Sequence, residues 1–179
     1  PGLIDLMGGK ARFEAKLDSL FTHVNPDIEL PIFSTGMIGQ YAQGNEPGHH
    51  VPYLYNYTDS PRKGADRIHE ILTKLYTNAP DGICGNDDTG QMSAWYVFSA
   101  LGFYPVDPLS DRYELGTPLM KSATIRLDNG KTFTVEAPAL SDTRRYIGSA
   151  TLNGKPLDRR YITYPEIMAG GTLTLDMTE

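Results

Sequence analysis

"GICGNDDTGQMSAWYVFSALGFYP", from Gly82 to Pro105, is the stretch on which the fold prediction rests. A polar turn flanked by glycines runs directly into a segment in which Met92 and Trp95 recur at helical spacing. Gly102 follows the last periodic residue, and the proline that closes the stretch lies just beyond it, which is a typical helix end. The stretch therefore predicts a helix that begins after Asp88 and ends near Gly102.

Two segments upstream of this stretch also have helical periodicity. In "KARFEAKLDSLF" the apolar residues Phe13, Leu17 and Phe21 recur on one face. In "SPRKGADRIHEILTKLY" Ser60 occupies a favourable N-cap position, and Pro61 fits the first helical turn. The first part of the chain is therefore predicted to be helical.

Beyond residue 108 the period of the hydrophobic pattern changes from helical to two. "SATIRL" and "KTFTVEA" alternate apolar and polar residues around Asp128-Asn129-Gly130, a strong hairpin signal. "YIGSATLNG", "RYITY" and "GTLTLDM" are further strand candidates. The sequence thus predicts an α+β protein, with helices in residues 1–108 and a small antiparallel β-sheet or sandwich in 109–179. The boundary is expected at Pro108–Gly116, where prolines and polar residues cluster.

Composition excludes several classes of function. The formal net charge is −6, and Lys and Arg gather at most in neighbouring pairs, so a nucleic-acid partner is not expected. The sequence contains no apolar run of the roughly 18 residues that a membrane span requires. Cys84 is the single cysteine, which excludes an internal disulfide and favours a small buried side chain over a nucleophile.

The adjacent carboxylates Asp87 and Asp88 have two interpretations. Asp88 could be the N-cap of the helix, with Gln91 three residues later completing a capping box. However, one short polar residue suffices for a cap, whereas here Asn86, Asp87 and Asp88 form a cluster between glycines, where a ligand can approach the backbone closely. An ionised carboxylate in such a loop could act as a general base on water. The two roles are compatible with each other.

A second polar cluster lies in "GQYAQGNEPGHHVPYLYNY", residues 39–57. Asn45, Glu46, His49 and His50 stand here among several tyrosines. Amides, carboxylates and aromatic rings are the groups that sugar sites use, because rings cover apolar sugar faces and polar groups meet hydroxyls. The alternative is a structural turn that starts at Glu46, with the tyrosines in a core.

Metal ligands are sparse in this pattern. His49 and His50 are adjacent and lack the i, i+4 spacing of helical zinc ligands. Calcium prefers oxygen ligands such as those of Asn45 and Asp88, but the sequence has no EF-hand spacing. Phosphate-binding glycine patterns and the Gly-x-Ser-x-Gly elbow are absent as well, which disfavours nucleotide chemistry and serine hydrolysis.

Four blocks together resemble a known family. They are "PGLIDLMGG", "GNEPGHHVPYLYNY", "GNDDTGQMSAWYVFSALGFYPVDP" and "SATLNGKPLDRRYITYPEIMAGGTL". They look like successive blocks from the C-terminal part of glycoside hydrolase family 92, the calcium-dependent exo-α-mannosidases. The resemblance covers nearly the whole chain. It implies that the helices are the last part of an (α/α)6 catalytic barrel and that the strands form a C-terminal β-domain.

The resemblance also implies roles for individual residues. The general base of the family maps onto Asp88, and Asn86 stands where relatives often have an assisting Asp. Glu46, His49, His50 and Asp87 would contribute to the sugar site. Asn45 would contact the calcium ion. The implied reaction is the inverting hydrolysis of terminal α-mannosides of mannans or N-glycans.

The general acid of the family is a Glu in a block that should lie N-terminal to "PGLIDLMGG". We therefore expect this chain to be a fragment, inactive by itself, whose partners are a mannose-containing glycan and the N-terminal remainder of the same protein. Exposed barrel helices would favour a homo-oligomer. The family resemblance implies a periplasmic or secreted location. The competing hypotheses are a carbohydrate-binding module without catalysis and a structural module of a larger enzyme.

Overall fold

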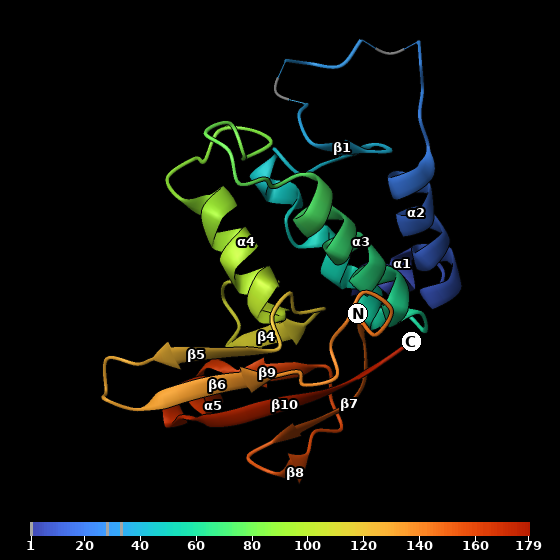
Figure 1. The fold of residues 1–179 in the computed structure, drawn as a ribbon. Helices are drawn as coiled ribbons and strands as arrows, with labels where there is room; N and C mark the ends of the chain where they lie inside the picture. Colours follow the sequence, from blue (N-terminus) through green and yellow to red (C-terminus); the bar gives the residue numbers. More distant parts are fainter. Residues whose placement is uncertain (1, 28, 33) are drawn as a thin grey trace. The chain divides into compact units, whose positions relative to one another are not determined.

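The computed structural model describes residues 2–27, 29–32 and 34–179. It divides into two compact units, residues 1–96 and 97–179, each of which is described by itself. Figure 1 shows the elements of both. The division falls inside helix α4 (Gln91–Leu101), earlier than the boundary expected after residue 108. The reason is that Phe98 and Leu101 of α4 pack into the core of the C-terminal unit.

Helices α1 (Gly2–Leu6), α2 (Lys10–Thr22) and α3 (Pro61–Lys74) belong to the N-terminal unit. The predicted apolar face of α2 is buried at Phe13, Leu17 and Phe21. Ser60 occupies the N-cap position of α3 as predicted, but its side chain makes no capping hydrogen bond. Burial of the apolar face, rather than this cap, is therefore the main stabilising contribution to α3.

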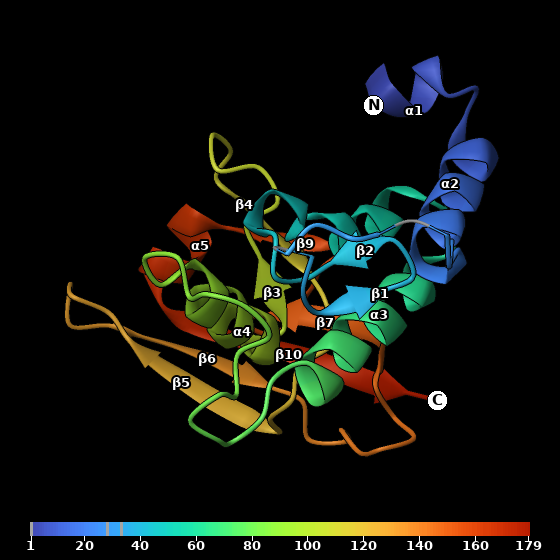
Figure 2. The same ribbon diagram turned by 90° about the horizontal axis from the view of Figure 1, so that it is seen from above.

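Residues 37–57, which precede α3, form short strands and 3₁₀ helices. Strands β1 (Met37–Ile38) and β2 (Tyr41–Ala42) pair antiparallel (Figure 2). They are followed by the 3₁₀ helices η1 (Glu46–Gly48) and η2 (Val51–Tyr57). Tyr41, Tyr53 and Tyr55 are buried, so these tyrosines form core and do not cover a sugar.

A glycine permits the close packing of α3 on η2. Gly64 is buried, and a Cβ atom there would come within 2.8 Å of the carbonyl oxygen of Pro52. Real Cβ contacts do not reach this distance, so a larger residue would push the two elements apart.

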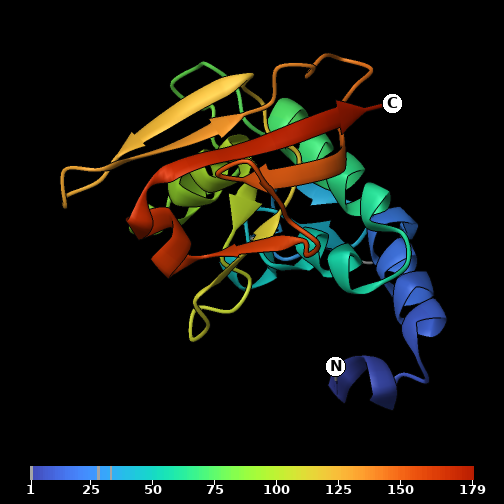
Figure 3. The ribbon, with the colours of Figure 1, turned by 90° about the horizontal axis from the view of Figure 1, so that it is seen from below.

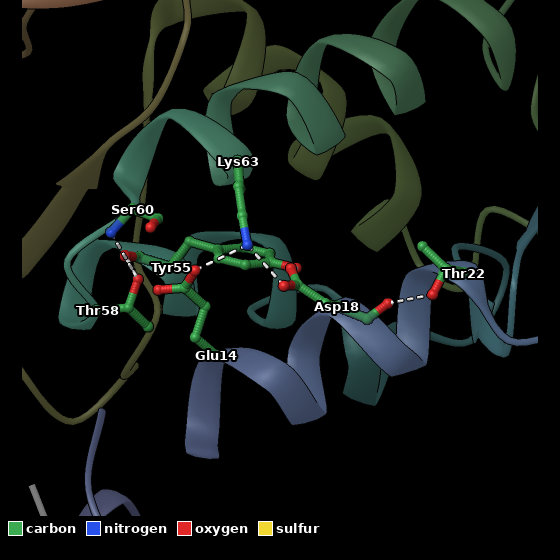
Figure 4. A network of polar contacts seen from close by, with 7 residues as sticks. All are labelled: Glu14, Asp18, Thr22, Tyr55, Thr58, Ser60 and Lys63. Atoms are coloured by element: carbon green, nitrogen blue, oxygen red, sulfur yellow. Dashed lines mark hydrogen bonds and ion pairs between the residues drawn. The ribbon is translucent and has the colours of Figure 1, made fainter. Parts of the chain in front are cut away.

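One charged cluster joins α2, η2 and α3 (Figure 4). Lys63 Nζ lies 2.7 Å from Glu14 Oε1 and 2.6 Å from Asp18 Oδ2, and the hydroxyl of Tyr55 donates a 2.9 Å hydrogen bond to Asp18 Oδ1. The hydrogen bond from Lys63 holds the pKa of Glu14 below its usual value, and the two carboxylates raise the pKa of Lys63. Burial, with a contribution from Asp18, raises the pKa of Tyr55, which therefore stays a neutral donor.

The C-terminal unit contains two sheets. The smaller one has the order β3 (Phe103–Tyr104), β4 (Arg112–Leu115), β9 (Tyr161–Thr163). The larger one has the order β5 (Ser122–Arg126), β6 (Thr132–Glu136), β10 (Gly171–Thr178), β7 (Tyr146–Leu152), β8 (Lys155–Pro156), which Figure 3 shows from one face. The prediction of an α+β fold with a small sheet domain is confirmed.

The predicted hairpin at Asp128-Asn129-Gly130 is also confirmed. β5 and β6 pair antiparallel on either side of it, and Gly130 has φ +80°, in the left-handed region that favours glycine. The sheet departs from a purely antiparallel one in a single respect among the described strands: β10 pairs with β6 in parallel and with β7 antiparallel.

The hydrophobic core of this unit is formed by alternate residues of the central strands. Phe133 and Val135 of β6 are buried, as are Leu173, Leu175 and Met177, which alternate along β10, one of the predicted strands. The short helix α5 (Tyr164–Ala169) was not predicted. Across the described residues of both units, the longest helices are too short or too polar to span a bilayer.

Candidate active site

The N-terminus of α4 is capped by Asp87. Its Oδ1 atom accepts hydrogen bonds from the backbone N–H and the hydroxyl of Ser93, both at 2.9 Å, and its carbonyl oxygen accepts the N–H of Met92 at 3.1 Å. This corrects the prediction that Asp88 is the N-cap with Gln91 as its capping-box partner. Because Asp87 accepts the backbone N–H of Ser93 in the first turn of α4, the carboxylate of Asp88 is not needed as a helix cap.

Asp88 lies at the tip of a strained turn. Asp88 has φ +46° and Thr89 has φ +61°, and the side chains of both are exposed. Asp tolerates this left-handed region, whereas a β-branched residue such as Thr rarely adopts it and pays roughly 1–2 kcal/mol. The turn thus holds an acidic side chain towards solvent at a cost in backbone energy, a pattern that is frequent at functional sites.

The carboxyl groups of Asp88 and Glu46 are in contact, although their elements are far apart in the sequence. The hydrogen bond to the Glu46 carboxyl raises the pKa of Asp88, and repulsion by the charges of Glu46 and Asp87 adds to the effect.

Glu46 has an unsatisfied oxygen. Its Oε1 atom is buried and has no hydrogen-bond partner within the described part of the chain. A buried acceptor without a partner costs free energy, so an unpaired carboxylate oxygen at this position is expected to meet a hydroxyl group or a cation of a ligand.

His49 lies beneath this surface, fully buried at 1% exposure. Its Nε2 atom lies 2.9 Å from the carbonyl oxygen of Gln43, and its Nδ1 atom lies 3.1 Å from Nε2 of Gln91. Burial lowers the pKa of His49, so the ring is neutral. The prediction that His49 contacts a sugar directly therefore conflicts with its place in the structure, because both ring nitrogens are engaged inside the protein.

The other predicted residues lie in the turns beside this pair. Asn45 is exposed at the N-cap position of η1, with no capping bond from its side chain. Asn86 is exposed in the loop before α4, and His50 is half-buried at the start of η2. The structure thus brings Glu46 and Asp88 into contact, whereas Asn45, Asn86 and His50 lie in the same turns without a side-chain contact to this pair among the interactions given for the described residues.

The calcium prediction can be compared with these oxygens. Calcium takes six to eight oxygen ligands, commonly carboxylates, amide carbonyls and water. The unpaired Glu46 Oε1 and the exposed amide of Asn45 are of this chemical type, so the residues present fit a hard cation. They are only part of a ligand set, since the described residues contain no group of three or more His, Cys, Asp or Glu arranged to hold a metal.

The C-terminal unit contains a cavity of about 410 Å³, and none of the predicted site residues lines it. Its charged lining includes Arg159 and Glu166, which form an ion pair. Glu166 also accepts hydrogen bonds from the N–H and hydroxyl of Thr163 at the start of α5. These charges are already used in holding β9 and α5 together, and the cavity carries no functional assignment.

Comparisons with known proteins show the family of this chain. The family model of the Glycosyl hydrolase family 92 catalytic domain matches residues 1–179. The chain belongs to glycosyl hydrolase family 92. An uncharacterized secreted glycosidase of Arthroderma benhamiae is 32% identical over 178 residues, which make up 98% of this chain and 21% of that protein.

Solved structures of family 92 members are similar to this chain. An α-mannosidase from Bacteroides thetaiotaomicron, in complex with mannoimidazole, matches with a TM-score of 0.89 and 44% identity over 95% of this chain and 22% of its own. An inverting mannosidase from the same organism matches with a TM-score of 0.83 and 41% identity over 98% of this chain and 25% of its own. The chain thus spans about a fifth to a quarter of the length of these relatives.

Proposed function

We propose that this chain supplies the general-base side of an inverting exo-α-mannosidase. The observation that carries the proposal is the exposed carboxylate of Asp88, which stands at a strained turn, contacts Glu46 and is not needed as a helix cap. The mannosidases among the similar structures supply the substrate class. The substrates would be terminal α-mannosides of mannans or N-glycans.

Each residue has a defined part in this proposal. Asp88 takes a proton from a water molecule that attacks the anomeric carbon, and Asn86 supports that water. Glu46 accepts hydrogen bonds from sugar hydroxyls through its unpaired oxygen, with Asp87 and His50 at the edge of the sugar site. Asn45 contributes an oxygen to calcium, which when bound orients hydroxyl groups of the mannose ring.

Inversion also requires an acid on the opposite face of the sugar. The two carboxyl groups of inverting glycosidases lie roughly 6.5–9.5 Å apart, which leaves room for the water. Glu46 and Asp88 are in direct contact, so they do not form such an acid–base pair. We therefore assign the general acid to another part of the complete protein, and the 179-residue chain alone is expected to release no mannose at an ordinary enzymatic rate.

The partners and location follow from the same proposal. The chain would act together with the remainder of its own protein on a mannose-containing glycan. A periplasmic or secreted location is consistent with the secreted glycosidase of Arthroderma benhamiae. A homo-oligomer through the exposed apolar side chains of the helical unit, such as Leu3 and Leu6, is a further expectation that light scattering tests.

The test is Asp88→Asn in the complete enzyme. Asn has nearly the same shape and tolerates a positive φ, so the turn should persist while the base is lost. We expect kcat to fall roughly 10²–10⁴-fold, as for the loss of a general base. The measurement is release of mannose from an α-mannoside. Asp81→Asn, the same change at an exposed position of the same loop, is the control and should leave kcat unaltered. Unchanged turnover in Asp88→Asn would assign the base to another residue.

A further inference from the structure

Hydrogen bonds tie the turn that carries Glu46 to the helix that follows Asp88. His49 stands directly after η1, and Gln91 is the first residue of α4. The ring of His49 bridges between them: its Nε2 meets the carbonyl oxygen of Gln43 in the turn, and its Nδ1 meets the amide of Gln91 on the helix. The two carboxyl groups of the candidate site thus sit on segments that one imidazole connects.

The hydrogen-bond partners of His49 determine which ring nitrogen carries the hydrogen. A carbonyl oxygen only accepts, so Nε2 of His49 carries the hydrogen and donates it to Gln43. Nδ1 is then an acceptor, and the amide nitrogen of Gln91 donates to it. This arrangement requires one tautomer of the His49 ring and one orientation of the Gln91 amide.

A second hydrogen bond also joins α4 to His49. The indole Nε1–H of Trp95, one turn further along α4, donates to the carbonyl oxygen of His49 at 2.9 Å. Trp95 is fully buried, and its ring stacks on that of Tyr76 at 6.0 Å. Tyr76 in turn accepts a 2.9 Å hydrogen bond from the side chain of Gln43. The turn and the helix are therefore held together at several points in a part of the unit that excludes water.

We propose that His49 and Gln91 are positioning residues, which set the separation between the Glu46 and Asp88 carboxyl groups. This inference rests on the proposed function, because it assigns the pair a role in the same reaction. The acidic loop, residues 86–89, is tied through Asp87 to Ser93 of α4, and the hydrogen bonds of His49 with Gln91 and Trp95 tie α4 to the turn that carries Glu46. A shift of about 1 Å in such a constellation can cost about 100-fold in rate.

Matched variants separate the two halves of the bridge in the complete enzyme. Asn places an oxygen near the position of Nδ1, so His49→Asn keeps the acceptor for Gln91 and loses the bond to Gln43. Gln places its amide nitrogen near Nε2, so His49→Gln keeps the bond to Gln43 and loses the acceptor. Gln91→Met removes the same contact from the other side at nearly the same side-chain length. Tyr55→Phe, which removes the hydroxyl bonded to Asp18, is the stability control.

The expected result is a split between kcat and KM. His49→Gln and Gln91→Met should each lower kcat roughly 10–100-fold with KM changed less than about 3-fold. The double variant should be no slower than either single one, because both remove one contact. His49→Asn should retain more activity than His49→Gln, and Tyr55→Phe should lower the unfolding midpoint with kcat unaltered.

Two readouts keep this inference distinct from the proposed function. If all three bridge variants lower only the unfolding midpoint, as Tyr55→Phe does, then His49 and Gln91 are structural and the inference is overturned. The second readout is the crystal structure of the Gln91→Met enzyme, in which the Glu46–Asp88 contact should be lost. If that contact is lost while the Asp88→Asn enzyme keeps full activity, His49 and Gln91 are positioning residues but Asp88 is not the general base. A retained contact would overturn the positioning pair whatever Asp88 does.

Discussion

Two clusters in the N-terminal unit each contain a pair of acidic residues, but the carboxyl pKa is lowered in one and raised in the other. On α2 and α3, Glu14 and Asp18 share the ammonium group of Lys63, and the pKa of Glu14 is lowered. At the acidic loop, Glu46 and Asp88 contact each other, no Lys or Arg among the described residues pairs with either carboxyl group, and the pKa of Asp88 is raised. The first arrangement stabilises the fold. The second leaves two acids in mutual repulsion, which is typical of a site whose partner is a ligand.

This contrast implies that different forces hold the two clusters. The charged cluster of α2 and α3 contributes its own attraction. The acidic loop is instead held from the interior by His49, Gln91 and Trp95. Substitutions at Trp95, at Lys63 and in the strained turn should therefore change stability by different amounts, the largest at Trp95 and the smallest in the strained turn.

The largest effect on stability is expected for Trp95→Ala. Trp95 is fully buried beneath the loop, and removal of a buried Trp side chain typically costs about 3–5 kcal/mol. Urea unfolding of the chain measures the loss. Trp95→Phe keeps a ring but removes the donor to the carbonyl oxygen of His49, so it should cost only about 1–2 kcal/mol. Equal losses for Trp95→Ala and Lys63→Met would contradict the view that burial holds the loop.

A smaller loss is expected for Lys63→Met. The side chain of Lys63 is 43% exposed, so solvent screens its ion pairs, and we expect a cost of about 1 kcal/mol at neutral pH. Lys10→Met is the matched control, because the pair between Lys10 and Asp59 is more exposed still and should contribute nothing measurable. Urea unfolding at low salt checks both variants.

The difference in unfolding free energy between wild type and Lys63→Met should depend on pH if it comes from the ion pairs. The pKa of Glu14 is lowered, so its contribution is complete above the unfolded value of about 4.3 and disappears as the pH falls through the folded value. The pKa of Lys63 is raised, so its contribution persists below about 10.4 and disappears as the pH rises through the folded value. The difference between wild type and Lys63→Met should therefore form a plateau between about pH 4 and 10. A difference that does not change with pH would assign the loss to packing.

The smallest expected effect is an increase in stability. Thr89 has φ +61°, so Thr89→Gly should relieve backbone strain and stabilise the chain by about 0.5–1 kcal/mol in spite of the greater freedom of glycine when unfolded. Thermal unfolding measures the shift. Thr77→Gly is the control: Thr77 is exposed in the preceding loop with no positive φ, and glycine there should not stabilise the chain. Stabilisation by both variants would show that strain at Thr89 is not the cause.

Local patterns predicted much of the fold. The helices of residues 10–22, 61–74 and 91–101 follow from their apolar periodicity, and the Asp128-Asn129-Gly130 turn pairs the strands on either side as expected. Helix α5 was missed although Thr163 and Glu166 have the spacing of a capping box, because the predicted strand ran to Tyr164 and the residues after it received no assignment. The parallel pairing of β10 with β6 has no local signal, since it depends on tertiary contacts.

The candidate site was predicted in its residue types and not in its contacts. Two acidic residues of one loop look equivalent in the sequence, and only the geometry shows that Asp87 caps the helix while Asp88 contacts Glu46. The neighbouring histidines likewise look alike, but His49 is buried and His50 is half-buried. Hydrogen bonds between distant segments, such as that of His49 with Gln91, leave no periodicity that a sequence pattern can reveal.

The place of β10 in the large sheet has a consequence for biosynthesis. The strand with the highest residue numbers is the central one, between β6 and β7. While the ribosome is still adding Gly171–Thr178, β6 and β7 lack their common neighbour, and Phe133 and Val135 lack the side chains that cover them. Nascent chains at this stage present open strand edges and apolar surface, which promote aggregation. A chaperone that binds extended apolar segments would therefore protect this unit most before Gly171–Thr178 leave the ribosome.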